Sequence, residues 1–286
     1  MNKEKIAILT DSGCDVPQKY IDMYHMYVLP LEIHFKEKHY QDGVDITPKE
    51  VYDRLNTEIP KTSLPTGETV LNMFKKIKAD GYEKVVVITL SSGLSGTNNM
   101  ISLIAKDYHE LEFTIIDTKN ISVGGGFSAI YAGKLIEEGK SYQEVCEIIS
   151  NGIKQSKVFF VVETLEYLQK GGRIGLVASL FGNALDLKPI ISCNDDGIYY
   201  TVAKVRGRKH SISKTIELAK KFAGEHKNYI MAIMNGAASD IANEIEIEMR
   251  PYVDQSSIFV ENQISPALGV HTGPGLIGIG FYLLGE

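Results

Sequence analysis

Short apolar runs that end in small polar residues, each followed by a helical segment, constrain this fold most. Residues 85–90 (VVVITL) lead directly into Ser91-Ser-Gly-Leu-Ser-Gly-Thr97, and a helix is expected from near Ser95 through residues 100–105. The other expected strands of the first half are residues 6–9, 28–35 and 113–117, and the other helices are 68–78, 128–138 and 142–153. Such alternation is typical of an open, mostly parallel sheet with helices on both faces.

The second half mixes hairpin signals with helices. Residues 189–192 and 198–205 flank Asn194-Asp-Asp-Gly197, which is typical of a β-hairpin turn. Further strands are expected at 158–162, 229–234, 257–263 and 276–284, and helices at 164–169, 212–223 and 239–248. We therefore predict an N-terminal α/β domain at residues 1–156 and a C-terminal α+β domain with a mostly antiparallel sheet at residues 157–286.

Composition excludes several classes of protein. The net charge of -6 and the pI near 5.7 argue against a nucleic-acid binder. The three cysteines, Cys14, Cys146 and Cys193, are too far apart for a disulfide framework or a zinc site, and the histidines show no metal-binding spacing, so no metal is expected. No secretory signal or long apolar stretch is found, and the cytoplasm is the expected location.

The segment GVHTGPGLIGIG, residues 269–280, contains a literal G-x-G-x-x-G at Gly273, Gly275 and Gly278. A dinucleotide site also needs a following helix and an acidic residue about 20 positions further on, within a βαβ unit. Only eight residues follow Gly278. We therefore expect a turn around Pro274 that leads into the last strand, with His271 either a structural histidine or a ligand contact.

The Ser/Gly loop after the strand at 85–90 is the strongest local signal. A strand, a loop of small residues and a helix N-terminus together present amide and hydroxyl groups to an anion, here a carboxylate or phosphate. The loop is no P-loop, and Thr97 stands where a nucleophile elbow would need its last glycine. An acyl-ester hydrolase with Ser95 as nucleophile, His271 as base and Asp11 or Asp117 as the orienting acid stays an alternative.

Three further stretches carry polar residues beside helix or strand ends. Thr62 and Ser63 precede a helix that Thr66 or Gly67 can cap, and we interpret them either as part of that cap or as a ligand loop at the carboxyl end of a strand. Arg173 and Arg206 have glycine neighbours that let an anionic partner approach their guanidinium groups. Lys170, Arg208 and Lys209 are expected to be solvated surface charges.

These pieces, in this order, resemble the DegV proteins, bacterial fatty-acid-binding proteins of the fatty acid kinase system. The resemblance rests on the following segments: Thr10-Asp-Ser12, Lys61-Thr-Ser-Leu-Pro65, Ser91–Thr97, Ile116-Asp117, Leu165-Glu-Tyr-Leu168, Gly171-Gly-Arg-Ile174, Lys188-Pro-Ile190, Val205-Arg206 and Gly269–Gly275. It spans essentially the whole chain. Leu64 departs from the family loop, which usually reads T-S-Q-P, and this leaves any contact from that position open.

The resemblance implies a non-enzymatic carrier that buries a long-chain fatty acid such as palmitate, stearate or oleate. The family residues that hold the carboxylate correspond to Thr62, Ser95 and His271, with Ser63, Ser92 and Gly96 supporting the loops. Arg173 and Arg206 correspond to residues associated with docking the kinase and its nucleotide phosphates.

The implied partners are a dihydroxyacetone-kinase-like fatty acid kinase subunit and an acyltransferase that accepts the acyl-phosphate. The carrier is expected to be a monomer without a cofactor and with transient membrane contact. Burying about 14 methylenes at roughly 0.8 kcal/mol each offers about 11 kcal/mol, within the range of the association cost of about 4–15 kcal/mol. The tail can thus retain the ligand while uncharged donors, rather than an arginine clamp, orient the head.

Overall fold

The computed structural model describes residues 2–180 and 187–285. Its N-terminal part is built on a parallel sheet of four strands in the order β2-β1-β6-β7. The strands are β1 (Ile6–Asp11), β2 (Tyr27–Leu29), β6 (Lys84–Thr89) and β7 (Glu112–Asp117). Every residue of β1 is buried, as expected for a parallel strand covered on both faces.

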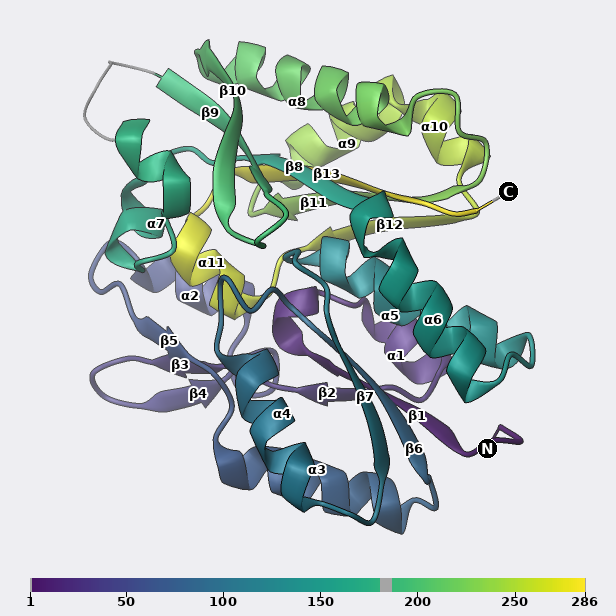
Figure 1. The fold of residues 1–286 in the computed structure, drawn as a ribbon. Coiled ribbons are helices and arrows are strands. Elements are labelled where there is room, and N and C mark those ends of the chain that lie inside the picture. Colours follow the sequence, from purple (N-terminus) through teal and green to yellow (C-terminus); the bar gives the residue numbers. More distant parts are fainter. Residues whose placement is uncertain (1, 181–186, 286) are drawn as a thin grey trace.

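Helices cover both faces of this sheet, as the sequence predicted. On one face α3 (Gly67–Ala79) and α4 (Thr97–Asp107) pack against alternate strand residues. On the other face lie α5 (Val123–Glu137) and α6 (Tyr142–Gly152). Figure 1 shows the two pairs on opposite sides of the strands, with the short helix α1 (Gln18–Met23) close to α5.

The predicted strand at residues 28–35 is wrong, because the chain changes sheet within it. Pro30, which lacks an N–H group, follows β2, and the next residues form β3 (Glu32–His34) in a separate three-stranded antiparallel sheet of order β4-β3-β5. Its other strands are β4 (His39–Gln41) and β5 (Lys61–Ser63), and α2 (Pro48–Arg54) lies between them in sequence. Thr62 and Ser63 therefore lie on a strand of this small sheet, not on the predicted loop.

The C-terminal part carries a six-stranded sheet in the order β10-β9-β8-β13-β11-β12, in which only β11 and β12 pair in parallel. The predicted mixed α/β class and the mostly antiparallel second sheet are confirmed. The strands are β8 (Ser156–Val161), β9 (Leu187–Cys193), β10 (Tyr199–Arg206), β11 (Tyr229–Gly236), β12 (Ile258–Gln263) and β13 (Leu276–Leu283).

One face of this sheet packs against α8 (Arg208–Ala223), α9 (Ser239–Glu248) and α10 (Arg250–Gln255). The other face points toward the N-terminal part, where α5 contacts strands of both large sheets. Figure 1 shows α5 and the short helix α11 (Pro266–Thr272) between the upper and lower halves of the molecule. The helix α7 (Glu166–Lys170) and the 3-10 turns η1 (Ser12–Cys14), η2 (Ile153–Gln155) and η3 (Gly175–Leu180) complete the described elements.

The largest group of buried apolar side chains draws on both halves of the chain, from Leu31 and Phe127 to Phe160 and Met234. The strand that opens the second sheet begins at Ser156, next to the predicted boundary. The division into two domains at that point stays a prediction. Both halves of the chain contribute side chains to the hydrophobic layer between the two large sheets.

Candidate functional site

A pocket opens within this shared layer, and its walls are mostly apolar. The space between its walls is about 830 Å³, a figure that includes open solvent. The apolar lining includes Leu31, Leu90, Leu94, Ile121, Val123, Val158, Phe160, Met234, Ile264, Leu268 and Leu276. Five polar residues that the sequence singled out, Thr62, Ser63, Ser95, Arg173 and His271, also line it.

Thr62 and His271, 209 positions apart, are joined by a hydrogen bond of 2.6 Å between Oγ1 and Nε2. His271 lies in the last turn of α11, whose N-terminus is capped by the Ser265 side chain. The predicted glycine–proline turn therefore begins after the histidine, with Gly273 at a φ of 67°. It is the helix, and not the turn, that directs His271 toward Thr62.

The imidazole of His271 is neutral at physiological pH. Burial, together with the nearby charge of Arg173, lowers the pKa of His271 to about 3. Its Nδ1 atom is shielded from solvent and has no hydrogen-bond partner among the described residues. A Cβ on Gly171 would lie 2.0 Å from Nδ1, so this ring position depends on a glycine there.

The Ser/Gly loop between β6 and α4 is held by contacts to the second half of the chain. The Ser91 hydroxyl donates to the carbonyl of Gly197 at 2.9 Å, and a Cβ on Gly93 would lie 2.8 Å from the same carbonyl. The β9–β10 hairpin turn thus packs directly on the loop. Ser95 lines the pocket, and its hydroxyl lies 2.9 Å from that of Thr97.

The residues expected to support the two loops have other partners. The hydroxyl of Ser92 accepts from Lys119 and its N–H donates to Asp117, and Ser92 does not line the pocket. Gly96 is the N-cap of α4, and a Cβ there would lie 3.5 Å and 3.9 Å from the two methyls of Leu64. Leu64, where the family loop carries glutamine, therefore contributes an apolar contact between the two loops.

Ser63 points to the opposite side of β5 from Thr62. Its hydroxyl lies 2.7 Å from Nε2 of His34 and 3.2 Å from a carboxylate oxygen of Glu32, which are neighbours on the small sheet. Residues adjacent on a strand face opposite ways, so only one of the pair can join the His271 contact. Ser63 contributes to the edge of the pocket, while Thr62 makes the contact with the histidine.

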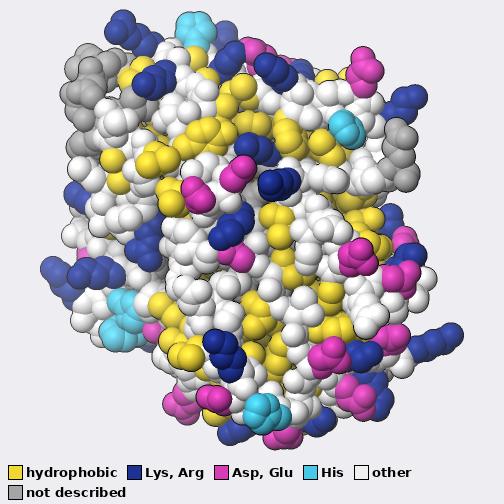
Figure 2. Space-filling view, in the orientation of Figure 1, with side chains coloured by type: hydrophobic (Ala, Val, Ile, Leu, Met, Phe, Trp, Pro, Cys, Tyr) yellow, Lys and Arg dark blue, Asp and Glu magenta, His cyan; other side chains and the backbone are white. Residues whose placement is uncertain are grey.

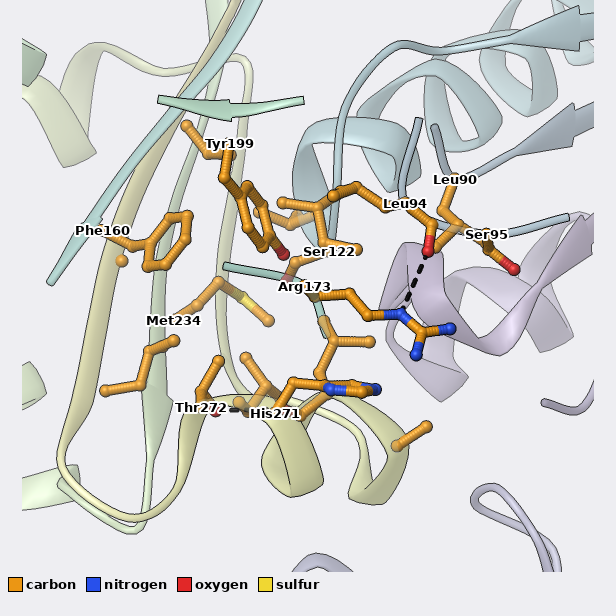
Figure 3. Close-up of a pocket in the computed structure, with 18 of the residues that line it drawn as sticks. Leu90, Leu94, Ser95, Ser122, Phe160, Arg173, Tyr199, Met234, His271 and Thr272 are labelled. Atoms are coloured by element: carbon orange, nitrogen blue, oxygen red, sulfur yellow. Dashed lines mark hydrogen bonds between the residues drawn. The ribbon is translucent and has the colours of Figure 1, made fainter. Parts of the chain in front are cut away.

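Arg173 lies in the pocket, which differs from the expectation of an uncharged head site. Its Nε donates to the carbonyl of Leu94 at 3.4 Å and its Nη1 to the carbonyl of Gly171 at 2.8 Å. Figure 3 shows the side chain extending toward Leu94 and Ser95, with His271 nearby. A guanidinium carries its charge at every relevant pH, so this end of the pocket is cationic.

The structure does not bring Arg206 to the pocket. Arg206 is exposed at the end of β10 and lines a shallow surface hollow with His210 and Lys214. Arg208, expected to be a solvated charge, is instead paired with Glu163 at 3.4 Å and donates to the carbonyl of Gly275. On the face seen in Figure 2, basic and acidic side chains are interspersed.

Three buried carboxylates accept hydrogen bonds from segments that form the pocket. Asp15 accepts from the Ser122 hydroxyl and the Ser265 N–H, and Asp42 accepts from the Ala267 N–H at the start of α11. Asp11 accepts from the N–H of Leu90 at the end of β6. Burial raises the pKa of Asp11 and Asp15 to about 7 and that of Asp42 to about 6.

Several pocket residues had no signal in the sequence. Ser122, Tyr199, Phe160 and Met234 line the pocket, and Figure 3 shows them around its inner part. They lie on separate elements and have no common spacing, so only the fold brings them together. Ser122 has a φ of 54°, uncommon for a residue with a side chain, at the start of α5.

The described ranges, 2–180 and 187–285, contain no cluster of His, Cys, Asp and Glu side chains that could hold a metal ion. Within the same ranges, no helix combines the length and apolar character needed to cross a membrane.

Residues 5–284 of the chain match the family model described as "Uncharacterised protein, DegV family". A DegV domain-containing protein of Clostridium acetobutylicum is 40% identical over 276 residues, which cover 96% of this chain and 98% of the relative. A DegV domain-containing protein of Staphylococcus aureus is 31% identical, with 96% and 98% covered.

Solved structures share the fold over nearly the whole length. A DegV family protein of Thermus thermophilus, described as fatty-acid-binding, superposes with a TM-score of 0.91 at 27% identity, covering 99% of this chain and 100% of the other. The fatty-acid-binding DegV of Bacillus subtilis gives 0.89 at 26%, with 99% of each chain covered. A stearic-acid-binding protein of Eubacterium ventriosum gives 0.87 at 30%, with 96% and 97% covered.

Proposed function

This chain belongs to the DegV family, and on that premise we propose that it binds one long-chain fatty acid in the pocket between its two large sheets. The observation that carries the proposal is the asymmetry of that pocket. Thr62, Ser95, Arg173 and His271 come from separate segments to one end, and the lining toward the six-stranded sheet is mostly apolar. A carboxylic acid with a long alkyl tail has the same asymmetry.

The carboxylate is bound by Thr62, Ser95 and His271, with Arg173 supplying the positive charge. When Nε2 of the neutral His271 carries the proton, it donates to Thr62, and the Thr62 hydroxyl hydrogen is free for a ligand oxygen. Ser95 has a hydroxyl partner, Thr97, that can accept or donate, so it can turn its own hydrogen to the carboxylate. Charge-assisted bonds from Arg173 strengthen the same end.

The acyl tail extends toward the six-stranded sheet, between Phe160, Tyr199 and Met234. Each buried methylene contributes roughly 0.8 kcal/mol, so a tail such as that of palmitate, stearate or oleate supplies most of the affinity. The head contacts fix the orientation of the ligand and add to its affinity. Such a ligand is retained by its tail while its carboxylate is held at a fixed position near the surface loops.

The protein is then a carrier that presents the carboxylate to a separate, dihydroxyacetone-kinase-like fatty acid kinase and carries the acyl-phosphate to an acyltransferase. Phosphoryl transfer requires a Mg-bound nucleotide and positioning groups, which the kinase supplies. Arg206, exposed and away from the pocket, serves as a docking contact for that partner. Because the reaction uses ATP, the proposal places the protein in the cytoplasm, as a monomer that contacts the membrane surface transiently.

The geometry does not favour the alternative of a hydrolase that uses Ser95. His271 bonds to Thr62 and not to Ser95, and its lowered pKa makes the imidazole a weak base. Asp11 and Asp117 accept bonds from backbone N–H groups of the strand end and the loop, which is a structural use of these carboxylates. A fluorophosphonate probe should therefore leave Ser95 unlabelled.

Mass spectrometry of an organic extract tests the proposal directly. Protein purified from a bacterial host should release fatty acid after denaturation, in about one equivalent per chain. Delipidated protein should take up palmitate, stearate or oleate again. A protein that is empty on purification and also fails to bind added acid would refute the proposal.

A further inference from the structure

The strand β13 is buried on both faces but carries side chains on only one of them along its middle. Ile277, Ile279 and Phe281 pack into the core on the outer side of the sheet. On the inner side the strand presents Leu276 and Tyr282 at its two ends. The two inner positions between them are Gly278 and Gly280. A wholly buried strand with a bare centre leaves a hollow that something else must fill.

The two glycines differ in what lies above them. At Gly280, a Cβ would meet the ring of Phe127 and a methyl of Val158, both at 3.0 Å, so neighbouring side chains already occupy that space. At Gly278, a Cβ would make only ordinary contacts, 3.5 Å to the Cβ of Phe160 and 3.7 Å to that of Met234. Packing explains Gly280, whereas no such contact requires a glycine at 278.

The hollow over Gly278 belongs to the pocket, at the end away from the polar residues. Phe160 and Met234 are the cross-strand neighbours of Gly278, on β8 and β11, and all three line the pocket. Figure 3 shows Phe160 and Met234 against the sheet and Ser95 on the opposite side of the pocket. A ligand whose head lies at Ser95 therefore has its tail directed to Gly278.

We propose that Gly278 sets the depth of the pocket, and with it the longest acyl chain that the protein accepts. Phe160 and Met234 form the sides of this end, and the bare backbone of β13 forms its floor. The inference rests on the proposed function, since it assumes an acyl ligand with its carboxylate at Ser95. It adds a residue that discriminates chain length.

Competition between saturated acids of 12 to about 20 carbons tests the proposal. Delipidated wild type, Gly278→Ala, Gly278→Leu and Met234→Ala are each incubated with an equimolar mixture, and the bound acids are measured by mass spectrometry. Gly278→Leu removes room for on the order of two to four methylenes, so its bound profile should move to shorter chains. Affinity should fall roughly 10- to 200-fold for each methylene that no longer fits.

Gly278→Ala should shift the profile of bound acids to shorter chains by a smaller amount. Met234→Ala widens the same end of the pocket and should shift the profile to longer chains. Ile277→Val, a change on the outer side of β13 at a residue that does not line the pocket, is the control and should leave the bound profile unchanged. A wild-type profile in Gly278→Leu overturns the proposal. If Gly278→Leu does not fold, Gly278→Ala becomes the test, because its methyl makes only ordinary contacts. An unchanged profile in Gly278→Ala also overturns the proposal. A wild type that takes up no acid refutes the proposed function instead.

Discussion

The two ends of the pocket are built in opposite ways. The polar end takes one side chain each from four segments far apart in sequence: Thr62 on β5, Ser95 before α4, Arg173 after α7 and His271 on α11. The apolar end is the inner face of one sheet, where β8, β13 and β11 lie side by side. A substitution at the polar end removes one ligand contact, whereas the apolar end is part of the hydrophobic core. We expect variants at the polar end to change ligand affinity and variants at the sheet end to change stability or ligand shape.

Arg173→Met should have the largest effect on binding. It leaves the carboxylate in the pocket without its cation, at a cost of about 3 kcal/mol, or roughly 100-fold in Kd. Isothermal titration with palmitate measures the change. Arg206→Met is the control, because Arg206 is exposed and away from the pocket; it should keep the wild-type Kd and lose phosphorylation by the kinase. Equal losses of binding in the two variants would contradict the separate roles of the two arginines.

Thr62→Val and Ser95→Ala should each weaken binding by about 1.5–2 kcal/mol, or roughly 10- to 30-fold, because each removes a hydrogen bond to a charged group. Ser92→Ala is the matched control from the same loop, since its hydroxyl accepts from Lys119 outside the pocket. The measurement is displacement of a fluorescent fatty acid. A Ser92→Ala effect as large as that of Ser95→Ala would show that the loop, and not the Ser95 hydroxyl, is what matters.

A pair of glycine variants compares the two ends directly. Gly171→Ala should push the His271 ring away from Thr62 and lower affinity, because the added methyl would lie 2.0 Å from Nδ1. Gly280→Ala should instead lower the free energy of unfolding by about 1–3 kcal/mol through its clash with Phe127. Urea unfolding and ligand titration on both proteins separate the effects. If Gly171→Ala lowered only stability and Gly280→Ala lowered only ligand affinity, the comparison between the two ends would be overturned.

Much of the fold could be predicted because most strands and helices are long and strongly patterned. The exceptions have physical reasons. The three-residue strands β3, β4 and β5 are too short for a periodic signal. The start of α5 was missed because Gly124, Gly125 and Gly126 are poor helix formers, yet a Cβ on any of the three would meet a neighbour at 2.9 Å or less, so packing requires glycine there.

The site could be predicted only in part. The resemblance named Thr62, Ser95 and His271, and the structure brings them to one pocket. The resemblance could not show that Arg173 enters the pocket whereas Arg206 lies exposed outside it, since the direction of each side chain depends on the packing of α7 and β10. The helix α11 was missed, and with it the direction of His271, because it is only seven residues long and contains Gly269, although Ser265 and Pro266 form a helix-start signal.

The buried carboxylates should make stability depend on pH. The pKa of Asp11 and Asp15 is about 7 in the folded protein, above the ordinary value of 3.8, so their contribution is full at low pH and is lost as the pH rises through 7. The contribution of His271 to stability has the opposite pH dependence, because its folded pKa of about 3 lies below the ordinary value of 6.5. Above pH 6.5 this contribution is nearly constant. Stability should therefore fall by roughly 1–2 kcal/mol between pH 6.5 and 8.

Urea unfolding at these two pH values, in ligand-free protein, measures that fall. Asp15→Asn keeps an acceptor for the Ser265 N–H and removes one of the titrating groups, so it should reduce the fall by about half. Glu50→Gln serves as the control, because the pKa of Glu50 is lowered and lies outside this range. A rise in stability toward pH 8 would mean that Asp11 and Asp15 are ionised in the folded protein across the whole range.

Leu64→Gln should have the smallest effect, although it restores the residue that the family loop usually carries. Leu64 does not line the pocket, and its nearer methyl lies 3.5 Å from the position that a Cβ on Gly96 would take. The exchange should change Kd by less than about threefold and stability by less than about 0.5 kcal/mol, as for a surface substitution. A tenfold gain in affinity, measured by the same titration as for Arg173→Met, would show that the side chain at position 64 also belongs to the polar end. In that case the carboxylate lies nearer to the β5–α3 connection than a position set only by its hydrogen bond with Thr62.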